Sequence, residues 1–432
     1  MKTRLRNSAA GLSGVALAVA LALPAQASEK ELLDILLQNG TITQEQHAQL
    51  SKRDYAKITR ENAEKAEELK TAIKDNVPSW VDKMKWTGDF RVRHDWQGFD
   101  QNTDPSKVDR SRERIRARFG FTYDVNPASQ IGIMLSSGEG EAVSTNSTLN
   151  DRFGAKTIWL DQAYVKHNFF DKRMTVYAGK FVNPFKTASS LIYDPDLRFE
   201  GAAAQYEFSN GAFVNGGLFP LDESSSKTAD PYLLGVQAGF KHEVGDDYPW
   251  NVAVGYYHYN DTSRISLGAP VECKDVTIGT DTVSKCSAKD FAGGNTETRF
   301  KVLNPNFTVG IRSLPIYTAV YGDYAHNTAA KTDNNGWLLG TRFGKEKIKD
   351  YLDLQGFVQY SHLEANASFD DFAESDFHSG GTNNKGWMMG YKLGLGQGWQ
   401  HDLTYYQSSE IKDQTAMHDD EKRVQLDLSY KF

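Results

Sequence analysis

Sixteen segments of the chain alternate apolar and polar residues with the period of a β-strand, and this repeat constrains the fold more than any other feature. In one segment, for example, Leu234 and Val236 alternate with Gly235 and Gln237. The segments cover 85–98, 110–124, 128–138, 157–169, 173–182, 198–209, 211–220, 232–244, 249–260, 297–309, 314–325, 335–346, 350–363, 385–396, 398–410 and 421–432. The repeat predicts an all-β protein built from amphipathic strands.

The connections between these segments are alternately short and long. Short connections such as 125–127 and 170–172 are followed by long ones such as 139–156, 183–197 and 261–296. Tight turns at one end and long loops at the other are typical of transmembrane β-barrels, whereas a soluble β-sandwich does not require them. We therefore predict a transmembrane antiparallel β-barrel of about 16 strands over residues 81–432, which would enclose a water-filled channel.

The last segment, 421–432, has one apolar and one polar face and ends on an aromatic residue. An amphipathic edge strand of a soluble sheet is one interpretation. However, Tyr430 and Phe432 at the chain end resemble the closing strand of Gram-negative outer-membrane barrels, in which this pattern is the assembly signal. The resemblance implies recognition by the barrel assembly machinery, and contact with outer-membrane lipid and lipopolysaccharide.

The N-terminal region differs from the rest of the chain. Basic residues, an apolar run and the small-residue site Ala25-Gln26-Ala27 predict a secretory signal peptide over residues 1–27. Residues 28–80 are rich in Ala, Glu and Lys and predict a helical segment in the periplasm. A coiled coil is one possibility, but heptads would place Asn62 and Lys65 in the seam. A solvated helix, or one that leans on the barrel, is the alternative.

Composition excludes several classes of protein. Mean hydropathy is −0.55, and after the signal peptide no apolar run is long enough for a membrane helix. A net charge of −7 argues against nucleic acid as a partner. The two cysteines, Cys273 and Cys286, lie close together in an exported chain, so we predict a disulfide that stiffens one loop.

An arginine ladder is the clearest sign of an inner wall. In segment 110–124 five arginines occupy even positions, while Ile115 and Phe119 share the odd ones. A charged helix face is the alternative interpretation. Arginines on a lipid-facing surface would cost about 2–4 kcal/mol each near the midplane, so we expect them to point inward. The predicted pore-lining residues are Arg91, Arg93, Arg112, Arg114, Arg116 and Arg118.

The connection at 183–197 joins the fifth and sixth predicted strands. Its apolar residues could pack against the inner wall, and its acidic residues could face the arginines across a constriction. An ordinary surface loop is the alternative. The predicted constriction residues are Lys186, Tyr193, Asp194, Asp196 and Arg198.

Two stretches of this chain resemble the "putative porin" family of Gram-negative outer membranes. One runs from Gly-Lys-Phe-Val-Asn-Pro-Phe, residues 179–185, to Phe-Glu-Gly-Ala-Ala, residues 199–203. The other is Leu-Leu-Asp-Ile-Leu-Leu-Gln-Asn-Gly, residues 32–40. The resemblance implies a porin with an unassigned substrate. Phosphate-selective porins are similar in layout, but no lysine cluster here indicates phosphate.

No catalytic or metal-binding motif stands out in the sequence. The ten histidines show no metal-ligand spacing, and we expect neither an enzyme nor a cofactor or metal ion. The acidic stretch 370–376 lacks the spacing of a calcium loop, so we expect a solvated external loop there.

The function predicted from these features is passive diffusion of small hydrophilic solutes through a homotrimeric outer-membrane barrel, with modest anion preference. The alternative is a barrel that serves mainly as an envelope-tethering or adhesion anchor.

Overall fold

The computed structural model describes residues 34, 36–49, 60, 64–65, 80–100, 109–223, 230–244, 247–260, 262, 273–278, 281–286, 295, 299–412 and 420–432. The chain divides into two compact units, Met1–Asp82 and Lys83–Phe432. In the first unit residues 36–38 and 44–49 are helical. Thr43 and Gln46 exchange side-chain to backbone hydrogen bonds, 3.2 and 2.9 Å long, which form a capping box. The predicted signal peptide, and Asn62 in the predicted helix, lie outside the described residues.

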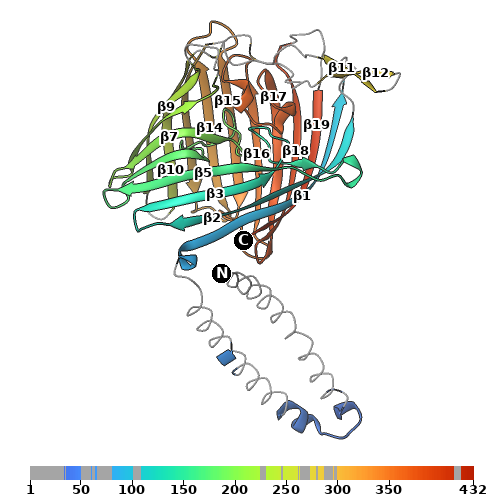
Figure 1. Cartoon of the computed structure of the whole chain (residues 1–432). Coiled ribbons are helices and arrows are strands. Elements are labelled where there is room, and N and C mark those ends of the chain that lie inside the picture. The colour runs from blue at the N-terminus through green and yellow to red at the C-terminus, as the bar shows by residue number, and fades with distance from the viewer. Residues whose placement is uncertain are drawn as a thin grey trace, which may run out of the picture. The chain divides into compact units, whose positions relative to one another are not determined.

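The second unit contains sixteen long antiparallel strands among its described residues (Figure 1). They are β1 (Met84–Asp100), β2 (Arg110–Asp124), β3 (Ser129–Ser137), β5 (Ile158–Phe169), β6 (Met174–Val182), β7 (Arg198–Glu207), β8 (Ala212–Pro220), β9 (Tyr232–Val244), β10 (Tyr248–Asn260), β13 (Phe300–Ile311), β14 (Tyr317–Asn327), β15 (Asn335–Gly344), β16 (Leu354–Leu363), β17 (Asn384–Gly396), β18 (Trp399–Glu410) and β19 (Asp420–Lys431).

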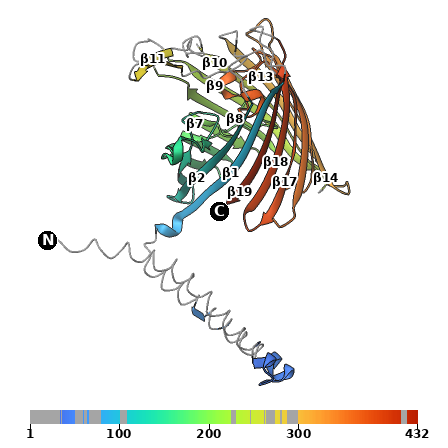
Figure 2. The same cartoon turned by 90° about the vertical axis from the view of Figure 1, so that its right-hand side faces the viewer.

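The sheet closes on itself, because β19 pairs with both β18 and β1. Phe90 lies opposite Tyr430 and Arg93 opposite Asp427. Beyond the last strand residue, Gly88 and Phe432 exchange two backbone hydrogen bonds of 3.2 Å. Strands β1, β2 and β19 lie side by side in Figure 2. The predicted fold class, an antiparallel barrel of sixteen strands, is confirmed.

Short elements occur within the long connections. They are the strands β4 (Ser147–Thr148), β11 (Cys273–Ile278) and β12 (Asp281–Cys286), and the 3₁₀ turns η1 (Val81–Lys83), η2 (Asp151–Phe153), η4 (Asp370–Phe372) and η5 (Phe377–Ser379). The sequence pattern did not predict the β11–β12 hairpin. Cys273 and Cys286 are directly opposite each other in that hairpin, and the disulfide between them stays a prediction.

Apolar side chains lie on the outer surface and polar ones on the inner surface. Along β1, Phe90 and Val92 are about 40% exposed, whereas the intervening Arg91 is mostly buried. On β19, Leu428 is exposed and Arg423 is only 2% exposed. This inversion of a soluble protein's pattern is what a barrel in lipid requires, since its interior is wet and its outer band is apolar.

Pro305 lies in the middle of β13, where it leaves the strand one backbone N–H donor short. Pro305 has no N–H to donate to the neighbouring strand. The side-chain amide of Asn304 instead donates to the Tyr324 carbonyl, at 2.7 Å, and to the carboxylate of Asp323, at 2.6 Å. Asn304 is fully buried, so no water can replace these bonds.

We therefore expect Asn304→Leu to destabilise the barrel by about 2 kcal/mol, because it leaves two buried acceptors without a donor. Urea unfolding of the detergent-folded protein measures this change. Asn251→Leu is the matched control, since the Asn251 amide makes no hydrogen bond with the described residues and its Oδ1 is buried and unpaired. Equal effects of the two substitutions would contradict the assigned role of Asn304.

Candidate functional site

The connection between β6 and β7, residues 183–197 (loop L3), crosses the interior of the barrel. Ser189 donates to Asp323 on β14 at 2.8 Å. The Ala188 carbonyl accepts from Arg342 on β15 at 3.2 Å. Lys186 exchanges two backbone hydrogen bonds of 2.8 Å with the amide of Gln237 on β9. Because β14 and β15 follow β6 and β7 by several strands, these contacts place L3 across the lumen.

Apolar residues of L3 pack into an aromatic cluster inside the barrel. Leu191, Ile192 and Tyr193 are at most 3% exposed. The Tyr193 ring contacts Tyr257 with centroids 5.2 Å apart, and its hydroxyl lies 3.3 Å from that of Tyr259. The interpretation of 183–197 as an ordinary surface loop is therefore wrong.

The connection between β16 and β17, residues 364–383 (loop L7), also folds inward. Asp376 lies 2.7 Å from Arg93 and 3.0 Å from Arg423. The backbone N–H of Ser375 donates to Asp194 in L3 at 2.8 Å. The prediction of a solvated external loop at 370–376 is thus wrong. Its acidic residues resemble those of any wet loop, and the arginines that pair with Asp376 come from strands far away in the sequence.

A third connection, residues 138–157 between β3 and β5 (loop L2), contacts the same region. Thr145 donates to Asp196 in L3 at 3.1 Å. Ser375 in L7 donates to the Val143 carbonyl at 2.9 Å. Arg91 donates to Asn146 at 2.5 Å. The narrow part of the barrel is therefore built by three interlocked loops.

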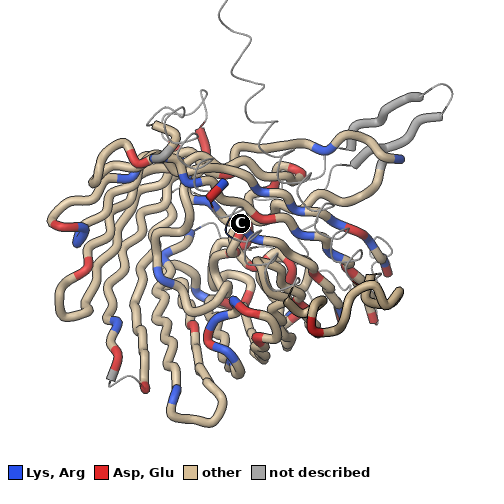
Figure 3. The backbone as a smooth tube through the Cα atoms, turned by 90° about the horizontal axis from the view of Figure 1, so that it is seen from below, with Lys and Arg blue, Asp and Glu red and all other residues tan. Residues whose placement is uncertain are grey.

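The predicted arginine ladder lies on the inner face of β1 and β2, where Arg91 is opposite Arg116 and Arg93 is opposite Arg114. Figure 3 shows acidic and basic residues interspersed along the strands rather than a purely cationic wall. Eight guanidinium groups share this wall with six carboxylates. The arginines are Arg91, Arg93, Arg110, Arg112, Arg114, Arg116, Arg118 and Arg423, and the acids are Asp89, Asp95, Asp196, Asp376, Glu421 and Asp427.

Arg114 differs from its neighbours in having no carboxylate partner. Its side chain is buried, and it makes no ion pair or hydrogen bond with the described residues; its Nε is buried without an acceptor. The Nε of Arg91 is also without an acceptor. Two guanidinium Nε donors on this wall are therefore buried without an acceptor, and no carboxylate directly neutralises the charge of Arg114 among the described residues.

A polar chamber of about 570 Å³ lies between L3, L7 and the inner wall. The guanidinium of Arg342 stacks on the Tyr321 ring, 4.3 Å from its centroid. The lining includes basic, acidic and amide side chains, among them Arg91, Arg93, Lys392, Glu374, Gln359 and Gln425. A chamber of this composition suits small hydrophilic solutes better than apolar ones.

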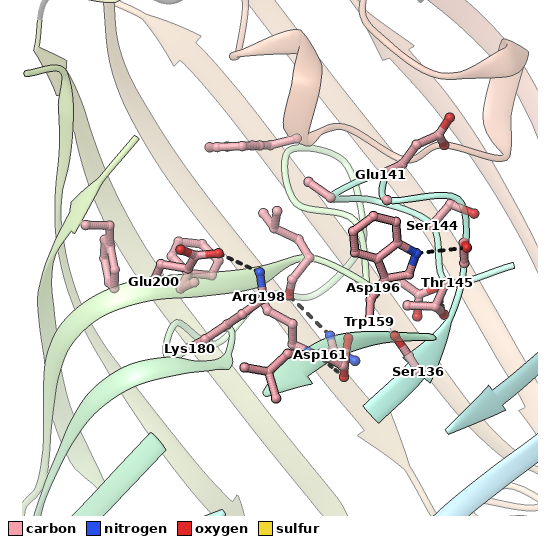
Figure 4. A pocket seen from close by; sticks show the side chains of 18 of the residues that line it. Ser136, Glu141, Ser144, Thr145, Trp159, Asp161, Lys180, Asp196, Arg198 and Glu200 are labelled. Atoms are coloured by element: carbon pink, nitrogen blue, oxygen red, sulfur yellow. Dashed lines mark hydrogen bonds and ion pairs between the residues drawn. The ribbon is translucent and has the colours of Figure 1, made fainter. Parts of the chain in front are cut away.

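Two predicted constriction residues lie away from this chamber. Lys186 pairs with Glu207 at 2.7 Å and lies over the Phe213 ring at 4.2 Å. Arg198 pairs with Asp161 at 3.1 Å in a second cavity, shown in Figure 4. Tyr193 and Asp194 do line the chamber. Asp196 lies between the arginines of β2 and loop L2.

The carboxyl groups of L3 and L7 differ in the direction in which their pKa values are shifted. Burial, and then the charges of Glu374 and Asp196, raise the pKa of Asp194 well above its ordinary value. Burial and the nearby Asp376 raise the pKa of Glu374 to about 7. Against the effect of burial, Arg93 and Arg423 hold the pKa of Asp376 well below its ordinary range. Asp376 is therefore ionised near neutral pH, while Asp194 and Glu374 keep a proton to higher pH than ordinary carboxyl groups.

The family model described as "putative porin" matches residues 101–314 and 314–432. The chain therefore belongs to this family, and it is a porin-type β-barrel of the outer membrane. This confirms the family resemblance in the sequence.

Solved porins share the fold at low sequence identity. OprB of Pseudomonas putida at high pH is 12% identical, with a TM-score of 0.52 over 82% of this chain and 95% of that chain. OmpT of Vibrio cholerae with loop L8 deleted is 14% identical, with a TM-score of 0.44 over 81% and 100% of the two chains. A mutant of the Rh. blastica porin is 11% identical, with a TM-score of 0.45 over the same shares. No curated protein sequence matches the chain.

None of the helices among the described residues is long and apolar enough to cross a membrane. The same residues contain no group of three or more His, Cys, Asp or Glu side chains arranged to hold a metal ion.

We expect the contact between L3 and L7 to loosen as pH rises. The pKa of Glu374 is raised from 4.5 to about 7 in the packed loops, so proton binding favours packing. This contribution is complete below pH 4.5 and is lost as pH rises through about 7. Single-channel current fluctuations should therefore increase from about pH 5 to about pH 8.

Glu374→Gln should remove most of this pH dependence, because the amide stays neutral. Glu139→Gln in L2 is the control and should keep it. Current noise that is independent of pH in the unmodified protein would contradict a role of Glu374 protonation in the packing of the loops.

Proposed function

We propose that this protein is a passive diffusion channel for small hydrophilic solutes, with a modest preference for anions. The observation that carries the proposal is the chamber between L3, L7 and the β1–β2 wall. Its lining carries charged and amide side chains from both the strands and the loops, and the adjoining wall has two more guanidinium groups than carboxylates. Solutes cross down their concentration gradient, without covalent chemistry.

The arrangement of charge supports a mechanism for selection. Arg91, Arg93 and Lys392 line the chamber together with the carboxylate of Asp427. The field between opposite charges orients dipolar solutes during passage. Because most arginines are already paired with carboxylates, the net excess is small, which favours a modest rather than a strict anion preference.

The proposal extends to the parts of the protein that complete this role. Residues 1–27 act as a cleaved export signal, and residues 28–80 lie in the periplasm as a helical segment. The barrel assembly machinery recognises the C-terminal strand ending in Tyr430 and Phe432. The outer surface contacts lipid and lipopolysaccharide, and three copies form a homotrimer.

Conductance measurements in planar bilayers test the channel directly. A diffusion channel should give steady open currents and let small sugars, amino acids and organic acids swell protein-containing liposomes. The competing function, an envelope-tethering or adhesion anchor, predicts a blocked lumen without steady currents. That result would overturn the proposal.

Arg114→Gln should reduce anion preference with little effect on stability. Arg114 has no carboxylate partner among the described residues, so its removal leaves no buried acid unpaired. The change lowers the excess of guanidinium groups on the wall from two to one. The reversal potential in a salt gradient should therefore shift toward the value for equal permeability of anions and cations.

Asp376→Asn serves as the opposite change, because it removes a negative charge from the same wall and should shift the reversal potential the other way. Lys422→Gln is the control for a charge away from the lumen, because Lys422 alternates on β19 with the inward Arg423 and pairs with Asp100. A reversal potential that shows strong cation preference, and is unchanged in Arg114→Gln, would contradict anion selection by this wall.

A further inference from the structure

The inner wall formed by β14, β15, β16 and β17 contains two basic side chains without a counter-ion. These strands are neighbours in the sheet (Figure 1). Arg342 on β15 and Lys392 on β17 both line the chamber beside loop L3. Neither forms an ion pair with any residue that the structure describes, whereas Arg93 on β1 pairs with two carboxylates. This part of the lumen therefore has positive charge that no carboxylate neutralises directly.

Arg342 is held in place by an aromatic ring and by loop L3. Its guanidinium stacks on the Tyr321 ring, 4.3 Å from the centroid, and donates to the Ala188 carbonyl at 3.2 Å. The Tyr321 hydroxyl donates to Gln359 at 2.8 Å. The ring lies over Gly340, where a Cβ would come within 2.5 Å of it. A guanidinium has five N–H donors, so most of those of Arg342 have no acceptor among the described residues.

Apolar side chains lie beside Arg342 on the same inner face. Phe357 on β16 is directly opposite Arg342, which places their Cβ atoms about 4.5–5.5 Å apart. The Phe357 ring lies over Gly390 of β17, where a Cβ would come within 3.1 Å of it. Met388, two positions before Gly390, also lines the chamber. Phe357 and Met388 are only partly buried, so a ligand that covers them removes apolar surface from water.

Lys392 lies on the other side of this apolar surface. It is exposed, and it follows Gly390 by two positions on β17, so both residues face the lumen. Gln355 is its cross-strand neighbour on β16. Since Phe357 is opposite Gly390, it lies between Arg342 on one neighbouring strand and Lys392 on the other.

The carboxyl groups that line the same chamber have other partners. Asp402 accepts two hydrogen bonds from a glutamine side chain, at 2.7 and 2.9 Å. Asp427 pairs with Arg93 at 2.7 Å. The other two, Asp194 and Glu374, belong to the loops, and burial favours their neutral forms. None of these four acids forms an ion pair with the two basic residues on β15 and β17.

We propose that this surface, the Arg342 site, binds small carboxylates that carry an aromatic ring. The carboxylate accepts two parallel hydrogen bonds from the Arg342 guanidinium, whose planar fork matches it. The ring of the ligand lies on Phe357 and Met388, and Lys392 adds a second positive charge that attracts the anion. The inference rests on the proposed channel function and names one class of solute for it.

Other solutes satisfy only part of the Arg342 site. An inorganic anion such as phosphate pairs with the basic groups but leaves Phe357 and Met388 in water. A sugar can stack on an aromatic ring, but it supplies no charge for Arg342 and Lys392. An aromatic amine is repelled by both basic groups. A carboxylate with an aromatic ring is complementary to the whole surface.

Saturation-transfer NMR on the full-length protein in lipid nanodiscs measures weak binding without requiring conduction. The three probes are benzoate, acetate, which lacks the ring, and benzyl alcohol, which lacks the charge. Signal from empty nanodiscs is subtracted. Benzoate should bind about tenfold more tightly than either of the other probes, because only benzoate uses both the guanidinium and the apolar surface.

Substitutions separate the two parts of the Arg342 site. Arg342→Gln should weaken benzoate binding about tenfold, to the level of benzyl alcohol, because an amide does not pair with a carboxylate. Phe357→Leu should weaken benzoate binding about threefold and leave acetate binding unchanged. Phe343→Leu is the matched control and should change neither, because Phe343 is adjacent to Arg342 but on the outer face, 46% exposed.

Heat-modifiable mobility on gels confirms that each variant is a folded barrel. Phe357→Leu keeps the proposal falsifiable if Arg342→Gln disturbs L3 through the lost bond to Ala188. The Arg342 site is ruled out if benzoate binds no more tightly than acetate or benzyl alcohol. It is also ruled out if the folded variants of Arg342 and Phe357 both keep the unmodified affinity for benzoate.

Conductance in planar bilayers separates this inference from the channel function on which it rests. Steady currents without preferential benzoate binding would remove the Arg342 site and leave the channel function. Benzoate binding that depends on Arg342 and Phe357, in a protein without steady currents, would remove the channel function and leave the site.

Discussion

Pairing of the first and last strands is the constraint on which the rest of this structure depends. In a bilayer an unpaired strand edge has no water to bind, so a sheet must close. Closure through β1 and β19 also aligns Arg93 with Asp427, which form two hydrogen bonds of 2.7 and 2.8 Å. The same pairing that satisfies the backbone therefore assembles the most buried ion pairs of the inner wall.

The interlocked loops show how a wide barrel acquires a narrow and specific interior. Sixteen strands alone enclose far more space than a small solute needs. L3 is held on the opposite wall by Asp323, Arg342 and an aromatic cluster, and L7 is held by Asp376 on the arginines of β1 and β19. Pro305 has no backbone N–H to donate from β13. The side-chain amide of Asn304 donates to the Tyr324 carbonyl instead, and it also donates to the carboxylate of Asp323. Part of the anchoring of L3 thus depends on a buried network that runs from Asn304 through Asp323 to Ser189.

The inner wall carries both arginines and carboxylates, so its net positive charge is small. Most arginines are paired, and this pairing reduces both their desolvation cost and their attraction for anions. Arg114 has no carboxylate partner among the described residues, so its charge adds to the potential of the wall without being neutralised by a direct ion pair. The result suits a channel, since a solute must bind strongly enough to enter and weakly enough to leave.

Local periodicity in the sequence was enough to determine the strands, the faces they present and the order in which they pair. Every predicted strand lies within a few residues of an observed one, because lipid outside and water inside impose alternation along each strand. The inward direction of the arginines on β1 and β2 follows from the same alternation.

Partners from distant parts of the chain could be decided only by the tertiary structure. Arg93 and Asp427 are 334 positions apart, and nothing local distinguishes Asp427 from a solvated acid. For the same reason L7 was expected outside, and Arg198 was expected in the constriction although it pairs with Asp161 in a second cavity. A charged side chain has the same local signature whether it faces water or a buried counter-ion, and only the closed barrel determines which of the two it meets.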